Sequence, residues 1–246
     1  MIIIGLVLLA GTLDTVPAGT TPKESDTGII HGRITYSGEV PKPVKLMVVK
    51  DVKVCAKIDH FDDRLVVGID GGINNVVVSL DSVVEGKSID SLGTEFVLDQ
   101  KVCAYNPHIL IVPVNRQITV LNSDGILHNI HTYCKLNPPM NIAQPRFKKK
   151  LNMRLNEAEK VQVRCDVHGW MSAWLIVAEH AYYTVTDSAG KFSLRGVPPG
   201  TYRLNIWQEL LGEKSVQVTV KAREESELDF SFEEEKESNT KELLKK

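Results

Sequence analysis

The sequence predicts an all-β protein built as a β-sandwich or β-barrel. Short runs of β-branched and aromatic residues alternate with turn-forming residues along most of the 246-residue chain, a spacing typical of strands joined by turns. Only residues 157–160 and the chain end from Glu233 have a helix-favouring composition. The length allows one large domain or two small ones, each with a buried core.

The expected strands follow one another from Gly28 onward. They are the runs at 29–36, 46–49, 76–80, 96–98, 109–114, 118–121, 160–164, 173–177, 182–186, 192–194, 202–207 and 215–220. After the run at 118–121, a turn leads into a further strand that opens with His128 and Asn129. Each run is short, as strands of globular sheets usually are.

Composition and charge exclude several classes of protein. The chain is 43% apolar and 24% charged, with a formal net charge of −2. These values exclude a disordered chain and a polytopic membrane protein. They give no reason to expect nucleic-acid binding, which normally requires a basic excess. The four cysteines are too few for a disulfide-built scaffold, so the core must hold the fold.

The N-terminus resembles a secretory signal. Residues 2–11 form an apolar run that is too short to span a bilayer, and Val16-Pro17-Ala18 offers small residues for cleavage. We expect a signal peptide over residues 1–18 and a periplasmic, secreted or cell-surface protein, not integral to the membrane after cleavage. The alternative is a buried first strand. Export would place the cysteines in an oxidising compartment.

The clearest chemical motif is the loop after the strand at 160–164. Cys165, His168 and Met171 place a thiol, an imidazole and a thioether within seven residues. A blue-copper site uses two imidazoles and one thiolate, with a weak axial methionine. The second imidazole must come from His128 or His131. Because side chains alternate faces along a strand, only one of these two can point at the metal, and we choose His128.

These residues resemble the cupredoxin family, and within it the amicyanin and plastocyanin branch. The resemblance covers roughly residues 94–179, and Val120-Leu121-Asn122 is one of its matching motifs. It implies a Greek-key β-sandwich or barrel with one type-1 copper ion. The implied ligands are His128, Cys165, His168 and Met171, with Asn129 tying the first ligand's loop to the cysteine loop. It also implies that the exposed edge of His168 is the electron port.

The same residues also allow other interpretations. A zinc ion could bind His128, Cys165, His168 and a fourth ligand, either His131 or Cys134. Met171 is a poor zinc ligand, which favours copper. Of the remaining cysteines, Cys55 and Cys103 are the preferred disulfide because both lie outside the copper motif. Pairings with Cys134 are the alternatives.

Several further residues receive simpler interpretations. Asp124 is expected to be a turn residue, and Trp170 and Trp174 are expected to pack in the fold. The histidines at 31, 60, 108 and 180 are expected to be structural or to lie on the surface. One basic cluster is either a solvated loop or a docking patch for an acidic redox partner. Its members are Arg146, Lys148, Lys149, Lys150 and Arg154.

The segment 186–204 contains two turn signals, Asp187–Gly190 and the Pro-Pro-Gly at 198–200. It resembles the carboxypeptidase regulatory-like domain, a transthyretin-like β-sandwich. That resemblance implies that residues 28–93 with 180–232 form this sandwich and that the cupredoxin unit at 94–179 is inserted into it. One enlarged cupredoxin domain before residue 180 is the alternative. Residues 233–246 are expected to be a charged, solvated tail.

Together these features predict an exported type-1 copper protein that carries single electrons. We do not expect an enzyme, because a second copper centre would need clustered histidines and the seven in this chain are scattered. One alternative is a copper capture or delivery protein. Another is a cell-surface β-sandwich interaction module with a vestigial metal site.

Overall fold

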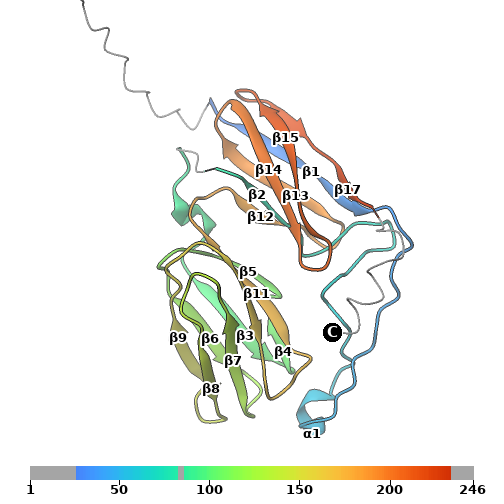
Figure 1. The fold of residues 1–246 in the computed structure, drawn as a ribbon, viewed down its shortest axis with the longest axis vertical. Helices are drawn as coiled ribbons and strands as arrows, with labels where there is room; N and C mark the ends of the chain where they lie inside the picture. The colour runs from blue at the N-terminus through green and yellow to red at the C-terminus, as the bar shows by residue number, and fades with distance from the viewer. Residues whose placement is uncertain (1–25, 83–85, 234–246) are drawn as a thin grey trace, which may run out of the picture.

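The computed structural model describes residues 26–82 and 86–233. The expected signal segment at 1–18 and the tail from residue 234 lie outside this range. The predicted fold class is confirmed, because the described chain consists of β-strands with two short helical turns, α1 (Val52–Cys55) and η2 (Ile89–Leu92). Four sheets form two sandwiches, one above the other in Figure 1.

The first sandwich uses strands from both ends of the described chain, and we call it the terminal sandwich. One of its sheets contains β13 (Lys191–Val197), β1 (Gly28–Tyr36), β16 (Glu225–Glu227) and β17 (Phe230–Phe232). The other contains β12 (Tyr183–Val185), β2 (Val77–Leu80), β14 (Gly200–Gln208) and β15 (Gly212–Val220). Alternation along β1 buries Ile30 and Ile34, which pack with Leu204 and Ile206 of the facing sheet.

The turn at Asp187–Gly190 forms as expected but does not make a hairpin within one sheet. Gly190 N donates to Asp187 O at 2.9 Å, and Gly190 adopts φ +76°, a conformation that favours glycine. The strands on either side separate, because β12 pairs with β2 and β13 pairs with β1. The turn therefore carries the chain from one sheet of the terminal sandwich to the other.

The second sandwich is built from a continuous stretch of chain, and we call it the central sandwich. One sheet has the order β5 (Ile109–Pro113), β11 (Ser172–Ala178), β10 (Lys160–Arg164), β7 (His128–Tyr133) and β8 (Asn141–Gln144). The other has the order β4 (Ala104–Asn106), β3 (Phe96–Lys101), β6 (Ile118–Asn122) and β9 (Lys150–Met153). Its core includes Leu98, Val120, Val163 and Leu175.

Strands in the described chain pair only within one sandwich. Those of 28–80 pair with those of 183–232, and those of 96–178 pair with one another. We therefore propose the inserted arrangement, in which the central sandwich interrupts the terminal one. The short strands β4, β8, β9, β16 and β17 were not among the expected runs, because they are brief and partly polar.

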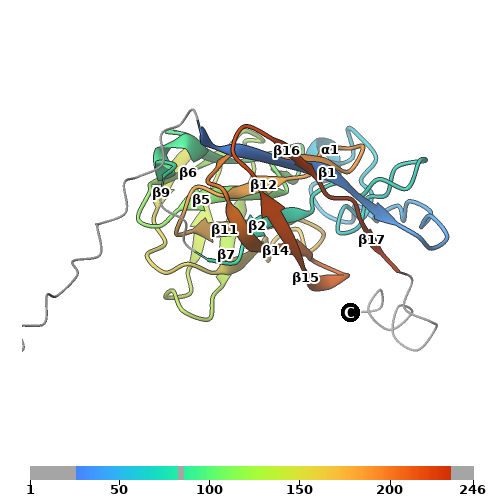
Figure 2. The ribbon, with the colours of Figure 1, turned by 90° about the horizontal axis from the view of Figure 1, so that it is seen from above.

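The long connection between β1 and β2 leaves the terminal sandwich and lies outside both sandwiches (Figures 1 and 2). Residues 44–62 within it form a narrow loop that we call the strap. Its two sides meet where Leu46 N donates to His60 O and Asp62 N donates to Val44 O, both at 2.8 Å. The tip carries α1. The expected strand at 46–49 is wrong, since no strand forms there: Met47 and Val49 are 79% and 72% exposed, and Val48 is partly buried against the central core.

The two sandwiches meet at an apolar cluster that draws on both. Val77 and Trp207 of the terminal sandwich pack with Ile109 and Ile176 of the central one. The ring of Trp174 meets that of Trp207 edge-on, with 4.9 Å between their centroids. The junction is therefore a small hydrophobic interface.

A buried charge network adjoins this cluster. Nε2 of His108, just before β5, lies 2.5 Å from Glu209 Oε1, and its Nδ1 lies 3.2 Å from Asp63 Oδ2. Trp174 Nε1 donates to the second oxygen of Glu209 at 2.8 Å. Burial alone would lower the pKa of His108, but Asp63 and Glu209 outweigh it and raise the pKa to about 10. His108 therefore carries its charge at neutral pH and joins both sandwiches to the segment after the strap.

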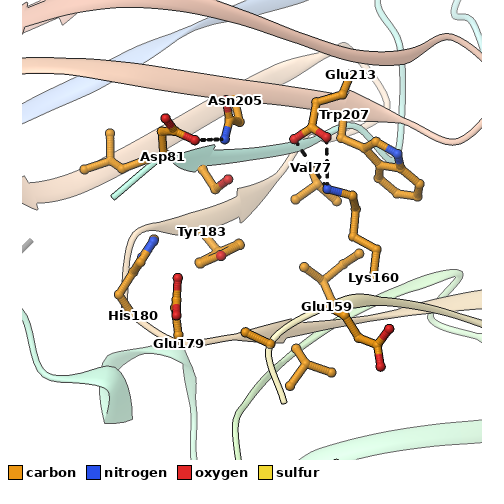
Figure 3. Close-up of a pocket in the computed structure, with 15 residues that line it drawn as sticks. Val77, Asp81, Glu159, Lys160, Glu179, His180, Tyr183, Asn205, Trp207 and Glu213 are labelled. Carbon is orange, nitrogen blue, oxygen red and sulfur yellow. Dashed lines mark hydrogen bonds and ion pairs between the residues drawn. The ribbon is translucent and has the colours of Figure 1, made fainter. Parts of the chain in front are cut away.

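A cavity of about 180 Å³ lies between the sandwiches (Figure 3). Across it, Lys160 of β10 donates to Glu213 of β15 at 3.2 Å. Beside it, Asn205 donates to Asp81 at 2.8 Å. The Lys160–Glu213 pair is a second polar link between the sandwiches, and we treat the cavity as part of their junction.

The substitution His108→Gln should destabilise the protein. It leaves the carboxylate of Glu209 buried without its charged partner, and breaking such a pair costs about 3 kcal/mol. We expect the free energy of unfolding, measured by urea denaturation at neutral pH, to fall by about that amount.

His108 should also make the stability of the protein depend on pH. Because the folded pKa of about 10 lies above the ordinary value of 6.5, the stabilisation by His108 is fully present below pH 6.5 and is lost as the pH rises towards 10. Urea midpoints across this range should fall more steeply for the wild type than for His108→Gln. Parallel curves would contradict the assignment.

Candidate metal centre

Three of the four predicted ligand residues converge at one end of the central sandwich. Cys165 Sγ lies 3.9 Å from His128 Nδ1 and 3.8 Å from His168 Nδ1, and the two Nδ1 atoms are 3.0 Å apart. The two histidines are 0% exposed and Cys165 is 1% exposed. At tetrahedral or trigonal angles, a metal with bonds of about 2.3 Å to sulfur and about 2.0 Å to nitrogen would place sulfur and nitrogen about 3.5–3.7 Å apart and the two nitrogens about 3.3–3.5 Å apart, so the two rings would move apart slightly on binding.

The sheet holds two of these side chains in place. His128 opens β7, and Cys165 follows directly after β10, which pairs with β7 in antiparallel register. The loop from Cys165 to Met171 closes on itself, because Met171 N donates to His168 O and Cys165 N donates to Met171 O. Asn129 Oδ1 accepts from Asp166 N at 2.7 Å. Asn129 therefore ties the loop to β7.

Asp124 supports His128 from the loop between β6 and β7. Its Oδ2 lies 2.9 Å from His128 Nε2, and its carboxylate also accepts from the backbone N–H groups of Val102 and Cys103. Asp124 lies in a turn, as the sequence predicts, but its contact with His128 is not expected from the sequence. Its position four residues before a ligand histidine was the signal that could have indicated this contact.

Asp51 supports His168 from the tip of the strap. Its Oδ2 lies 2.9 Å from His168 Nε2, although the two residues are 117 positions apart in the chain. The expectation that His168 has an exposed edge is wrong, because the strap covers it. Gly169, the next residue, is exposed.

The hydrogen bonds fix the protons of both imidazoles. A carboxylate can only accept, so Nε2 of His128 and Nε2 of His168 each carry N–H. In a neutral imidazole the opposite nitrogen, Nδ1, then has no proton. Two lone pairs and a sulfur atom thus face one another away from water, and they repel until a proton or a cation lies between them. The residues therefore fit a metal ion bound by two nitrogens and one sulfur.

The pKa directions agree with this arrangement. Burial opposes ionisation of Cys165, but hydrogen bonds from His128 and from backbone N–H groups hold the pKa of its thiol below the ordinary value. Burial lowers the pKa of His128, yet Asp124 and Cys165 raise it to about 8. For His168, burial and the nearby His128 prevail over Asp51, so its pKa is lowered. The pocket therefore favours a thiolate together with one positive charge.

The remaining candidate ligands and cysteines each have a different position in the structure. Met171 is buried in the same core as Cys165. His131 points elsewhere, with Nδ1 3.0 Å from Asp166 and its ring stacked on Tyr133. Cys134 is a free, partly buried thiol, and Cys55 and Cys103 form a disulfide. His131 and Cys134 are thus absent from the groups of possible metal ligands found in the described chain.

The basic cluster is divided between two places. Arg146, Lys148 and Lys149 lie in the turn between β8 and β9, and Lys150 opens β9. Gly125, beside Asp124, has Lys149 and Arg146 as its neighbours. Arg154 lies beyond the far end of β9, where it donates to Asn115 O. Four of the five residues therefore lie near the His128 side of the centre, and Arg154 does not.

The substitution Asp51→Asn should weaken metal binding. Asparagine tolerates the positive φ of 49° at this position but removes the charge that supports His168. Loss of a carboxylate behind a ligand histidine typically lowers metal affinity at least tenfold, so we expect the Kd for Cu(II), measured by chelator competition, to rise about tenfold.

Asp59→Asn is the matched control. Asp59 lies on the same strap and pairs only with the exposed Lys45, at 2.7 Å. Its substitution should leave the Kd unchanged. Equal effects of the two substitutions would show that Asp51 does not act through His168.

Among the described residues, no helix has the length and apolar character needed to cross a membrane. The family model for the carboxypeptidase regulatory-like domain matches residues 173–233. This match covers most of β11 and the strands from β12 to β17. No curated protein matches the chain.

Among solved structures, a Cu(I) form of an amicyanin mutant is 16% identical, covers 41% of this chain and 98% of its own, and has a TM-score of 0.32. A purple cupredoxin from Nitrosopumilus maritimus is 19% identical over 34% of this chain and 100% of its own, with a TM-score of 0.27. A copper-containing nitrite reductase from Thermus scotoductus is 15% identical over 40% of this chain and 25% of its own, with a TM-score of 0.32. The C-terminal strands of this chain thus match the carboxypeptidase regulatory-like domain, and its structural neighbours are amicyanin and other cupredoxins.

Proposed function

We propose that this chain is an exported type-1 copper protein that carries single electrons. The observation that carries the proposal is the convergence of two histidine Nδ1 atoms and one cysteine sulfur in a pocket shielded from water. That donor set suits copper in both of its common oxidation states, because sulfur is a soft ligand and imidazole accepts either state.

Each ligand has a distinct role in this proposal. Cys165 would supply the strong covalent link to the metal, and His128 and His168 would supply two nitrogen ligands. Met171, on the same closed loop, would be a weak fourth ligand whose thioether tunes the reduction potential. Asn129 keeps the cysteine loop fixed to β7. When bound, one copper ion supplies a centre that gains and loses a single electron.

The framework supports fast electron transfer because little has to move. The ligands lie at the ends of paired strands, and each imidazole is held by a carboxylate on its far side. Every group of possible metal ligands in residues 26–82 and 86–233 shares a residue with this centre. A carrier with one metal site is therefore favoured over an enzyme that uses two separate copper centres.

We place electron entry on the His128 side of the centre. The strap covers His168, so the edge used in the family resemblance is not available here. Arg146, Lys148 and Lys149 lie beside the loop whose Asp124 holds His128. This basic surface would steer an acidic redox partner to that side. The disulfide between Cys55 and Cys103 supports a location in an oxidising compartment.

The visible absorption and EPR spectra of the chain without residues 1–18, loaded with Cu(II), test the function. We expect an intense thiolate-to-copper band and a narrow hyperfine splitting, because Cys165 binds the metal directly. Cys165→Ser should abolish the band. Cys134→Ser, which removes the remote thiol, should keep it. A colourless protein that binds zinc instead would overturn the proposal.

The docking surface can be tested with small redox reagents of opposite charge. At low ionic strength the double substitution of Lys148 and Lys149 by Glu should slow oxidation by the anion hexacyanoferrate(III) about threefold or more, and should speed oxidation by a cationic cobalt complex. The same charge change at Lys191 and Lys214, on the terminal sandwich, should have little effect. The differences should vanish in high salt; equal rates for both variants would contradict the assignment.

A further inference from the structure

The disulfide lies directly against the metal centre. The sulfur atoms of Cys55 and Cys103 and a ring nitrogen of His168 all lie within 4.8 Å of one another. Cys103 Sγ is also within 4.8 Å of a ring nitrogen of His128. Both cysteines are fully buried. Cys165 is in contact with the same two histidines, so three cysteine sulfurs gather around one imidazole pair.

Separate parts of the chain bring these two cysteines together. Cys55 ends α1 at the tip of the strap, and Cys103 lies in the turn between β3 and β4. The indole of Trp170 donates to Cys103 O at 3.1 Å, and His60 Nε2 lies 2.9 Å from Cys55 O. The backbone N–H of Cys103 donates to the carboxylate of Asp124. The Cys103 side of the pair therefore stays in place whether or not the disulfide is intact.

The strap gives a reductant a route to the disulfide. Within residues 44–62 only Cys55 and His60 are buried, while Val48 and Val54 are partly buried against the central core. A segment with so few buried contacts opens locally at a small cost in free energy. A dithiol reductant can then attack: two electrons and two protons convert the disulfide into two thiols, and the reductant becomes a cyclic disulfide.

We propose that the reduced Cys55–Cys103 pair is a second copper site, specific for Cu(I) and adjacent to the first. Two thiolates are soft ligands that select Cu(I), and binding one ion releases the two thiol protons. The pocket is buried, which protects a Cu(I)–thiolate pair from oxidation. The proposal rests on the proposed copper function for the choice of metal, but it does not depend on Cys165 or Met171.

This site would make copper capacity depend on the state of the disulfide. The oxidised protein holds one ion and the reduced protein holds two. Because both sites lie beside His168, the second ion would bind next to the first.

The test counts Cu(I) ions bound by the protein before and after reduction. The chain without residues 1–18 is reduced anaerobically with a phosphine, desalted, and titrated with Cu(I) in competition with bicinchoninate. We expect one equivalent for the untreated protein and two for the reduced protein. One equivalent in both states overturns the proposal.

Three variants complete the design. The double substitution of Cys55 and Cys103 by Ser should bind one equivalent in both states. Cys134→Ser removes the remaining thiol outside the centre and should still gain one equivalent on reduction. Cys165→Ser should keep the gain but lose the original equivalent. If the proposed function fails while this inference holds, the oxidised wild type shows no blue band and reduction still adds one Cu(I).

A measurement on the reduced wild type avoids any folding defect in the variants. Alkylation by iodoacetamide, followed by mass spectrometry, reports which thiols are free. Two equivalents of Cu(I) should protect Cys55 and Cys103, while Cys134 remains reactive. Equal alkylation of Cys55 and Cys103 with and without Cu(I) overturns the proposal.

Discussion

The candidate metal centre depends on two hydrogen bonds that lie on the far side of its candidate ligands. Asp124 and Asp51 each accept a hydrogen bond from an imidazole Nε2, and this turns the two Nδ1 atoms towards each other and towards the sulfur of Cys165. Without those carboxylates the rings could exchange tautomers or turn away. With them, the pocket is already arranged for a cation, and the repulsion among three electron-rich atoms is relieved when one binds.

Each carboxylate links the centre to a different part of the molecule. Asp124 also holds the backbone of Cys103, so the β6–β7 loop, the β3–β4 turn and His128 form one unit. Asp51 connects His168 to the strap, which originates in the terminal sandwich. His108 connects the two sandwiches and the segment after the strap through Glu209 and Asp63. Both sandwiches therefore contribute to a site whose other residues come from the central one.

Local chemistry and periodicity were enough to predict the fold class, and they singled out His128, Cys165 and His168 as candidate ligands. The alternation of side chains along a strand separates His128, which lies beside Cys165, from His131, which lies beside Asp166. The contacts that sequence reasoning missed are those that need tertiary packing. Asp51 meets His168 across 117 positions, and nothing near Asp51 in the chain marks it as a partner. The run at 46–49 resembles a strand but forms none, since Met47 and Val49 are exposed and Val48 is only partly buried against the central core.

The position of the strap in the chain sets the order in which the protein can be completed during synthesis. The strands from β3 to β11 can pair among themselves as soon as residue 178 has emerged. The strand that anchors the base of the strap, β1, finds its neighbours only in β13, β16 and β17, the last of which ends at Phe232. In the growing chain the central sandwich therefore forms with its His168 side still open. The strap covers that side only after residue 232 has emerged, so the two sides of the centre are shielded from water at different steps of assembly.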